Sequence, residues 1–206
     1  DCSEMSTVYD DFNHARALDA CEVAIDGRTF PVSATILASV SNYFDQAFHE
    51  PAFRESQTKR VVIDRADEME ISKDDFHAYL RHSYNAREKI TGDTYLGLLK
   101  CADYFSSKTI LEDVEQFIIE HCCPEKWRSS KMNPDQPFAI EMIAGIELVF
   151  TYQLAALKEH MKEMLSTMRF HTFLKKYSQD VMVLPDELRI WIFDHYATTI
   201  IASQKA

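Results

Sequence analysis

The chain opens its first regular segment with apolar and polar positions that alternate on either side of an Asp-Gly pair. Residues 21–25 and 28–32 carry this alternation, and Asp26-Gly27 separates the two runs. A period of two is typical of a strand with one buried face, and Asp-Gly is a frequent two-residue hairpin turn. The pattern therefore predicts a β-hairpin.

From residue 33 the spacing becomes helical. Apolar residues recur every four positions as far as residue 48, which places them on one face of a helix. Ser41-Asn42 interrupts the run, and both residue types favour the position that caps a helix N-terminus. We expect two consecutive helices with a break there, the second ending before Pro51. The apolar positions are Ile36, Val40, Phe44 and Phe48, joined by Leu37 and Ala47.

Further along, residues 60–64 form a short β-branched run and predict a strand. Residues 74–84 have helical spacing. We expect Thr94 and Thr109 to cap the next two helices, whose apolar faces run to Phe105 and Ile118.

The segment 124–137 is rich in Pro, Ser and Asn and predicts a linker. Everything after it has helical spacing, including one apolar stripe from Phe150 to Leu165, and Pro185 marks the start of a last helix. We therefore predict an N-terminal segment over 1–19, an α+β domain over 20–123, the linker, and an all-helical extension over 138–206.

Charge narrows the class of partner. The 206 residues carry a net charge of −11. Nucleic acids and anionic membranes bind proteins largely through basic faces, and the sequence offers no such face. It also holds no leader pattern and no apolar run long enough to span a bilayer. Protein partners remain the expectation.

Cysteine and histidine suggest no reactive centre. The five cysteines include no CxxC pair, so we expect free thiols and an intracellular location, cytoplasmic or nuclear. His121 beside Cys122-Cys123 could hold a metal or a redox thiol, but a cluster that closes a helix end is the simpler interpretation. His77 and His82 are expected at the surface. Because the sequence has no glycine-flanked nucleophile and no local catalytic signature, we predict no catalytic, cofactor-binding or metal-binding residue.

An ordered series of short motifs resembles the BTB/POZ domain family over about residues 20–123. The first part is Val23-x-Ile25-Asp26-Gly27-x-x-Phe30-x-Val32-Ser33-x-x-x-Leu37-Ala38-x-x-Ser41-x-x-Phe44-x-x-x-Phe48. The continuation is Phe53-x-Glu55-Ser56, Arg60-Val61-x-Ile63-Asp64, Phe76-x-x-Tyr79-Leu80-x-x-Ser83-Tyr84, and Leu98-Leu99-Lys100-Cys101-Ala102-Asp103-Tyr104-Phe105 with Ile110-Leu111. Many members have His-Lys where this chain has Ser33-Ala34.

The resemblance implies the BTB/POZ fold, a helical bundle flanked by a small β-sheet. The tail over 138–206 resembles the helical BACK-type or 3-box extension that often follows such domains. The family commonly forms homodimers through its first helices and N-terminal segment. The residues this places in a dimer interface are Phe12, Leu18, Leu37 and Val40, although Phe12 and Leu18 could instead belong to a frayed tail.

Many members also bind cullin-3 through a hydrophobic-x-Glu element before the third strand, which Phe53-Arg54-Glu55 matches. An exposed Phe can fill a pocket of a partner while a carboxylate orients it. The alternative is a solvated loop whose Phe is tucked into the core. The positions implied for cullin binding are Phe48, Phe53, Glu55, Tyr104 and Phe105.

Three functions follow. The first is a dimerising adaptor that links a cullin-3 ubiquitin ligase to an unidentified protein substrate. The second is a scaffold that assembles a nuclear or cytoskeletal complex without ligase function. The third, an enzyme, has only the general supply of His, Cys and acidic residues in its favour.

Overall fold

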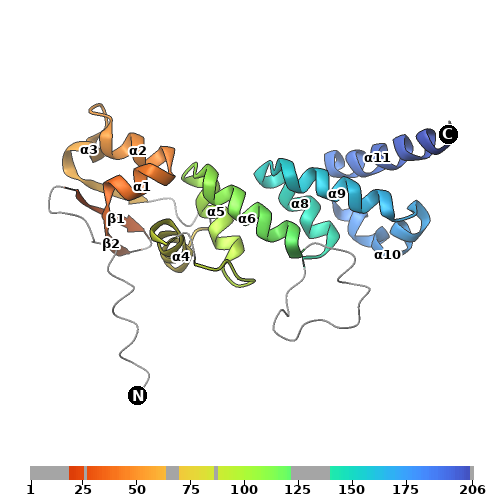
Figure 1. Ribbon diagram of the computed structural model, residues 1–206, viewed down its shortest axis with the longest axis horizontal. Coiled ribbons are helices and arrows are strands. Elements are labelled where there is room, and N and C mark those ends of the chain that lie inside the picture. Colours follow the sequence, from red (N-terminus) through yellow and green to blue (C-terminus); the bar gives the residue numbers. More distant parts are fainter. Residues whose placement is uncertain (1–18, 26, 64–69, 86–87, 122–139, 205–206) are drawn as a thin grey trace, which may run out of the picture. The chain divides into compact units, whose positions relative to one another are not determined.

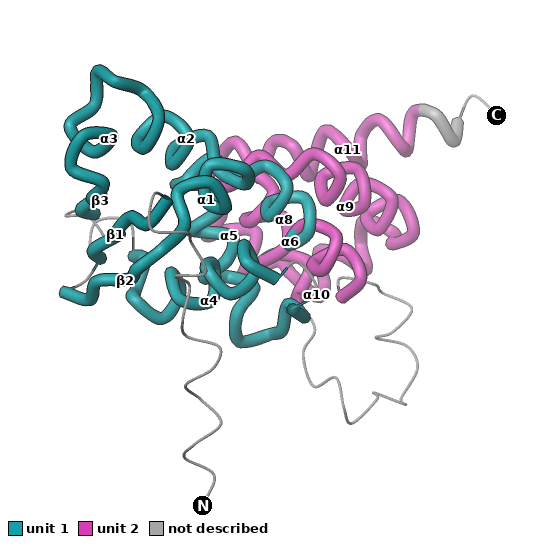
Figure 2. The backbone as a smooth tube through the Cα atoms, turned by 60° about the vertical axis from the view of Figure 1, so that its left-hand side comes forward, with its two compact units in different colours: residues 1–114 teal, residues 115–206 magenta. Residues whose placement is uncertain are grey.

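The computed structural model divides the chain into two compact units, Asp1–Val114 and Glu115–Ala206 (Figure 2), and each is described by itself. Figure 1 labels their helices and strands. The described residues are 19–25, 27–63, 70–85, 88–121 and 140–204.

A three-stranded sheet begins unit 1. It consists of β1 (Ala20–Ile25), β2 (Arg28–Ser33) and β3 (Arg60–Ile63), in the order β2-β1-β3. β1 and β2 pair antiparallel and end on the pair Ile25–Arg28, so the predicted hairpin is confirmed. Gly27 has a φ of 71°, a left-handed conformation that glycine adopts without steric cost. β3 pairs with β1 in parallel, a connection that the local pattern does not reveal.

The predicted break between the first two helices is also confirmed. Ser41 separates them, accepts a hydrogen bond from the Phe44 amide (3.2 Å) and donates one to the Phe105 carbonyl (2.6 Å). The same side chain therefore caps one helix and ties it to another. The helices of unit 1 are α1 (Ala34–Val40), α2 (Asn42–His49), α3 (Arg54–Thr58), α4 (Lys73–Tyr84), α5 (Tyr95–Tyr104) and the first half of α6 (Lys108–His121).

Two predicted caps are wrong in detail. Thr94 occupies the N-cap position of α5, but its hydroxyl accepts from the Thr91 amide (3.1 Å) and caps nothing in α5. α6 begins at Lys108, so Thr109 lies inside its first turn. The amide of Leu111 already bonds to the Ser107 carbonyl (3.0 Å), which starts the helix earlier.

The core of unit 1 is aromatic and centres on Phe105, which is fully buried. Its ring lies 4.8 Å from that of Phe44, 5.3 Å from Tyr79 and 5.5 Å from Phe76, measured between centroids. The Tyr79 hydroxyl bonds to that of Ser107 (2.6 Å), so its polar end is satisfied inside the core. This cluster connects α2, α4 and α5.

Unit 2 is helical in its described residues. The stripe from Phe150 to Leu165 is divided between two helices, because Gln153 adopts a left-handed φ of 54° and ends the first. The last helix starts after Pro185 as predicted. The helices are α8 (Met142–Tyr152), α9 (Ala155–Thr167), α10 (Phe170–Val183), α11 (Asp186–Gln204) and the second half of α6. None of the described helices is long and apolar enough to cross a membrane.

Ser33 and Asp19 together cap α1. The Ser33 hydroxyl accepts from the Ile36 amide (3.3 Å) and donates to the Asp19 carboxylate, which also accepts from the Thr35 amide and hydroxyl. Partial burial by itself would raise the pKa of Asp19, but the hydrogen bonds from Ser33 and Thr35 outweigh it and hold the pKa below its ordinary value.

This cap makes unit 1 sensitive to acid. A carboxyl whose pKa is lower in the folded state stabilises the fold above its unfolded pKa, and that contribution disappears as pH falls through the folded pKa. Below about pH 4, wild type should therefore lose more stability than Asp19→Asn, whose curve should be flatter. Urea unfolding at pH 7 and pH 3 measures this difference. Asp74→Asn, in the exposed first turn of α4, controls for the loss of one charge. If all three proteins lose the same unfolding free energy between pH 7 and pH 3, Asp19 is not the source of the acid sensitivity.

Candidate protein-binding surface

Phe53 and Glu55 lie on a short, tightly turned segment. The Phe53 amide donates to the Glu50 carbonyl (3.1 Å), and Phe53 forms the N-cap position of α3. The Lys59 amide closes the other end by donating to the Glu55 carbonyl (2.8 Å). The Phe53 side chain is 47% exposed, so the ring is presented at the surface from an ordered backbone.

Two tyrosines flank the buried Phe105 ring on α2 and α5. The rings of Tyr43 and Tyr104 are 5.9 Å apart and both border Phe105, with Tyr43 at 5.6 Å and Tyr104 at 5.0 Å. Burial raises the pKa of Tyr43 to about 12, and the negative charges of Tyr104 and Glu55 add to the shift. Glu55 therefore lies close enough to Tyr43 for its charge to act on the tyrosine hydroxyl.

We group four residues of α2, α3 and α5 as one candidate surface. We call Tyr43, Phe53, Glu55 and Tyr104 the aromatic–acidic surface; α2, α3 and α5 contribute to it. The sequence pointed to three of the four. Tyr43 was missed because it stands outside the four-residue spacing of its helix, and no sequence pattern connects it with Tyr104.

Two residues expected in the binding surface belong to the core instead. Phe48 is 1% exposed and Phe105 fully buried. Neither ring can touch a partner directly. Phe105 supports Tyr43 and Tyr104 from beneath, and the Phe48 carbonyl accepts from the Lys59 ammonium (3.4 Å).

A polar hollow of about 370 Å³ adjoins Glu55. Arg54, Thr58, Arg60 and the exposed Val62 also line it. Arg60 lies 3.8 Å from the Glu22 carboxylate. Arg54 and Arg60 thus line the same hollow as Glu55, so residues of both charge signs meet there.

The His, Cys, Asp and Glu side chains of the described residues bear on whether the chain holds a metal or a reactive thiol. Within those residues no cluster of His, Cys, Asp and Glu could hold a metal ion. Cys21 and Cys101 are free and buried, and burial raises the pKa of both thiols, which makes them poor nucleophiles. Cys122 and Cys123 lie outside the described residues.

His82 and His121 each have a hydrogen-bond partner within the fold. His82 is buried, against our expectation, and its Nε2 lies 3.1 Å from the Asp113 carboxylate. A residue of α4 can thus turn inward when α6 supplies a polar partner. His121 bonds to the Phe117 carbonyl (2.8 Å), one turn back in α6.

Comparison with known proteins decides the family. The sequence model of the BTB/POZ domain matches residues 9–122, more than half of the chain. The chain belongs to the BTB/POZ family. Among solved structures it is similar to the BTB domain of zebrafish PATZ1, with 19% identity and a TM-score of 0.39 over 48% of this chain and 75% of that one. No curated protein matches it.

Membership confirms the predicted α+β class and the BTB/POZ fold. BTB/POZ domains are protein-interaction modules that typically dimerise. Of the positions expected in a dimer interface, Val40 is half-buried on α1, whereas Leu37 is fully buried within the single chain. Phe12 and Leu18 lie outside the described residues.

Proposed function

We propose that this BTB/POZ protein is a dimerising, non-enzymatic adaptor that recruits cullin-3 through the aromatic–acidic surface. The observation that carries the proposal is the exposed Phe53 ring beside the Glu55 carboxylate, on a segment fixed by backbone hydrogen bonds. The buried thiols and the family's general character support a role without catalysis.

The position of the Phe53 ring suits a residue that anchors a partner protein. An aromatic side chain already held at the surface loses little conformational entropy when a partner encloses it. Tyr43 and Tyr104, whose rings are 5.9 Å apart, would add apolar area to the contact, and the Glu55 carboxylate would orient the partner. Residues over 138–206 would form the BACK-like extension, and a substrate or other partner would bind elsewhere on the chain or its assembly. An intracellular location follows from this role.

Titration calorimetry of the 206-residue chain with the N-terminal domain of cullin-3 tests the proposal, with light scattering to measure mass. We expect one cullin per chain. Phe53→Ala should cost about 2 kcal/mol of binding free energy, a loss of roughly thirtyfold in affinity. Glu55→Lys should abolish measurable binding, because a cation would replace the orienting carboxylate.

Leu96→Ala is the matched control. Leu96 is also an exposed apolar residue of unit 1 (39%), but it stands at the opposite end of α5 from Tyr104. Its removal should leave affinity within about twofold. A dimer that ignores cullin-3, or a Phe53→Ala variant that binds like wild type, would reject the adaptor role and favour a scaffold.

A further inference from the structure

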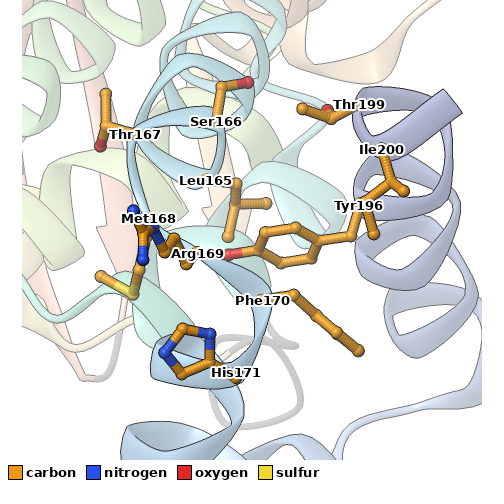
Figure 3. Close-up of a pocket in the computed structure, with 10 residues that line it drawn as sticks. All are labelled: Leu165, Ser166, Thr167, Met168, Arg169, Phe170, His171, Tyr196, Thr199 and Ile200. Atoms are coloured by element: carbon orange, nitrogen blue, oxygen red, sulfur yellow. The ribbon is translucent and has the colours of Figure 1, made fainter. Parts of the chain in front are cut away.

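A pocket in unit 2, remote in sequence from the aromatic–acidic surface, has a chemistry of its own. It opens at the connection between α9 and α10, is covered on one side by α11 and has a volume of about 460 Å³ (Figure 3). This volume lies in the range of small-ligand sites. Apolar groups dominate its walls, among them Leu165, Met168, Phe170 and Ile200.

One wall carries a hydroxyl with no partner. Tyr196 is 4% exposed, and its hydroxyl oxygen is buried without a hydrogen-bond partner among the described residues. Its ring lies 4.9 Å from that of Phe170. Figure 3 shows Tyr196 reaching across from α11, with the hydroxyl toward the segment between Leu165 and Arg169. An unsatisfied buried hydroxyl costs stability, so a ligand that accepts a hydrogen bond from it would recover that energy.

The start of α10 adds further donors. Arg169 is its N-cap residue and makes no side-chain cap. The amides of Thr172 and Phe173 bond to the Arg169 carbonyl (2.9 and 3.0 Å). The amides of Phe170 and His171 have no intrahelical acceptor, as is general for a first turn, and they lie at the positive end of the helix dipole.

The other hydroxyls of the pocket are already engaged. Ser166 donates to the Lys162 carbonyl (2.9 Å), Thr167 to the Met164 carbonyl (2.7 Å) and Thr199 to the His195 carbonyl (2.9 Å). The free donors are therefore the Tyr196 hydroxyl, the first amides of α10 and the Arg169 guanidinium. Although the whole chain carries a charge of −11, no acidic residue lines this pocket.

We propose that this pocket binds a peptide segment of a partner protein in which a carboxylate stands next to a large apolar side chain. The carboxylate would accept from the Tyr196 hydroxyl, the Phe170 and His171 amides and Arg169. The apolar side chain would rest against Leu165, Met168 and Ile200. Burial raises the pKa of Tyr196 to about 12, so the hydroxyl keeps its proton at neutral pH and can donate.

The surface around the pocket supports a peptide rather than a free anion. Phe193, 42% exposed, has its ring 5.9 Å from that of Phe170. Ile200 and Ile201 are 46% and 54% exposed. These residues continue the apolar wall along α11, which gives the flanking residues of a peptide an apolar surface to cover. A phosphate ion could use only the donors.

The test is a nuclear magnetic resonance titration of the isotopically labelled 206-residue chain with two blocked dipeptides, acetyl-Phe-Glu-amide and acetyl-Phe-Gln-amide. We expect the glutamate peptide to shift the Phe170 and His171 amide signals and to bind at least tenfold more tightly than the glutamine peptide. Tyr196→Phe should weaken the glutamate peptide roughly tenfold, and Arg169→Gln should weaken it too.

Tyr177→Phe is the matched control. Tyr177 is also buried, and its hydroxyl also lacks a partner within the described part of the chain, but it does not line the pocket. This variant should bind within about twofold of wild type. The proposal fails if the two peptides bind alike, if neither binds, or if Tyr177→Phe and Tyr196→Phe have equal effects. Inorganic phosphate that binds as tightly as the glutamate peptide would overturn the peptide assignment. None of these outcomes depends on cullin-3.

Discussion

Replacing Phe105 with alanine should lower the free energy of unfolding of unit 1 by about 3–5 kcal/mol. Phe105 is fully buried and its ring contacts those of Phe44, Phe76 and Tyr79. The change removes a large apolar side chain from contact with three helices and leaves a cavity that rigid rings fill poorly. Since small domains are stable by only about 5–15 kcal/mol, this is a large part of the total.

Hydrogen exchange followed by mass spectrometry measures the loss of stability separately in each helix. Peptides from α4 and α5 should lose protection, whereas peptides from α9 should change less. Phe53→Ala provides the comparison: its ring is half exposed, so unit 1 should lose under about 1 kcal/mol. Equal losses in the two variants would mean that Phe105 does not hold the core together.

Introducing a carboxylate on α1 should have opposite consequences at two positions one turn apart. Leu37→Asp should unfold unit 1. The variant loses about 1.5–3 kcal/mol of apolar burial and must in addition desolvate a carboxylate at a fully buried site, for a total above about 4 kcal/mol. Val40 is only half-buried, so Val40→Asp should remain folded but fail to dimerise, because like charges would meet across the interface.

Sedimentation equilibrium and circular dichroism separate these results. Wild type should be a dimer at micromolar concentration, Val40→Asp a folded monomer, and Leu37→Asp a chain with reduced helical signal. A wild-type protein that sediments as a monomer would refute dimerisation itself. A folded, dimeric Val40→Asp would place the interface away from the exposed side of α1.

The two partner surfaces we propose are separable. Phe53 and Glu55 belong to unit 1, and Tyr196 and Arg169 belong to unit 2. Variants at one surface should therefore leave binding at the other unchanged, because mutations without shared contacts usually act independently. An adaptor needs this arrangement, since it must hold two different proteins at once.

The local elements and the family could be predicted from the order of amino acids alone. Backbone preferences of a few neighbouring residues are enough to predict three features: the Asp-Gly hairpin, the break at Ser41 and the helix start after Pro185. The ordered motifs led to the BTB/POZ family for the same reason, since they record which positions face a core.

Which side chains meet depends on how distant segments pack in the folded chain. Tyr43 and Tyr104 are far apart along the chain, yet their rings lie 5.9 Å apart. His82 turns inward because Asp113, on another helix, supplies a polar partner. Whether an apolar residue is core or surface also depends on neighbours that periodicity does not specify: Phe53 is exposed, while Phe48 and Phe105 are buried. The Tyr196 hydroxyl has no hydrogen-bond partner among the described residues. No segment of sequence reveals this, because a missing hydrogen bond depends on every group that the folded chain brings nearby.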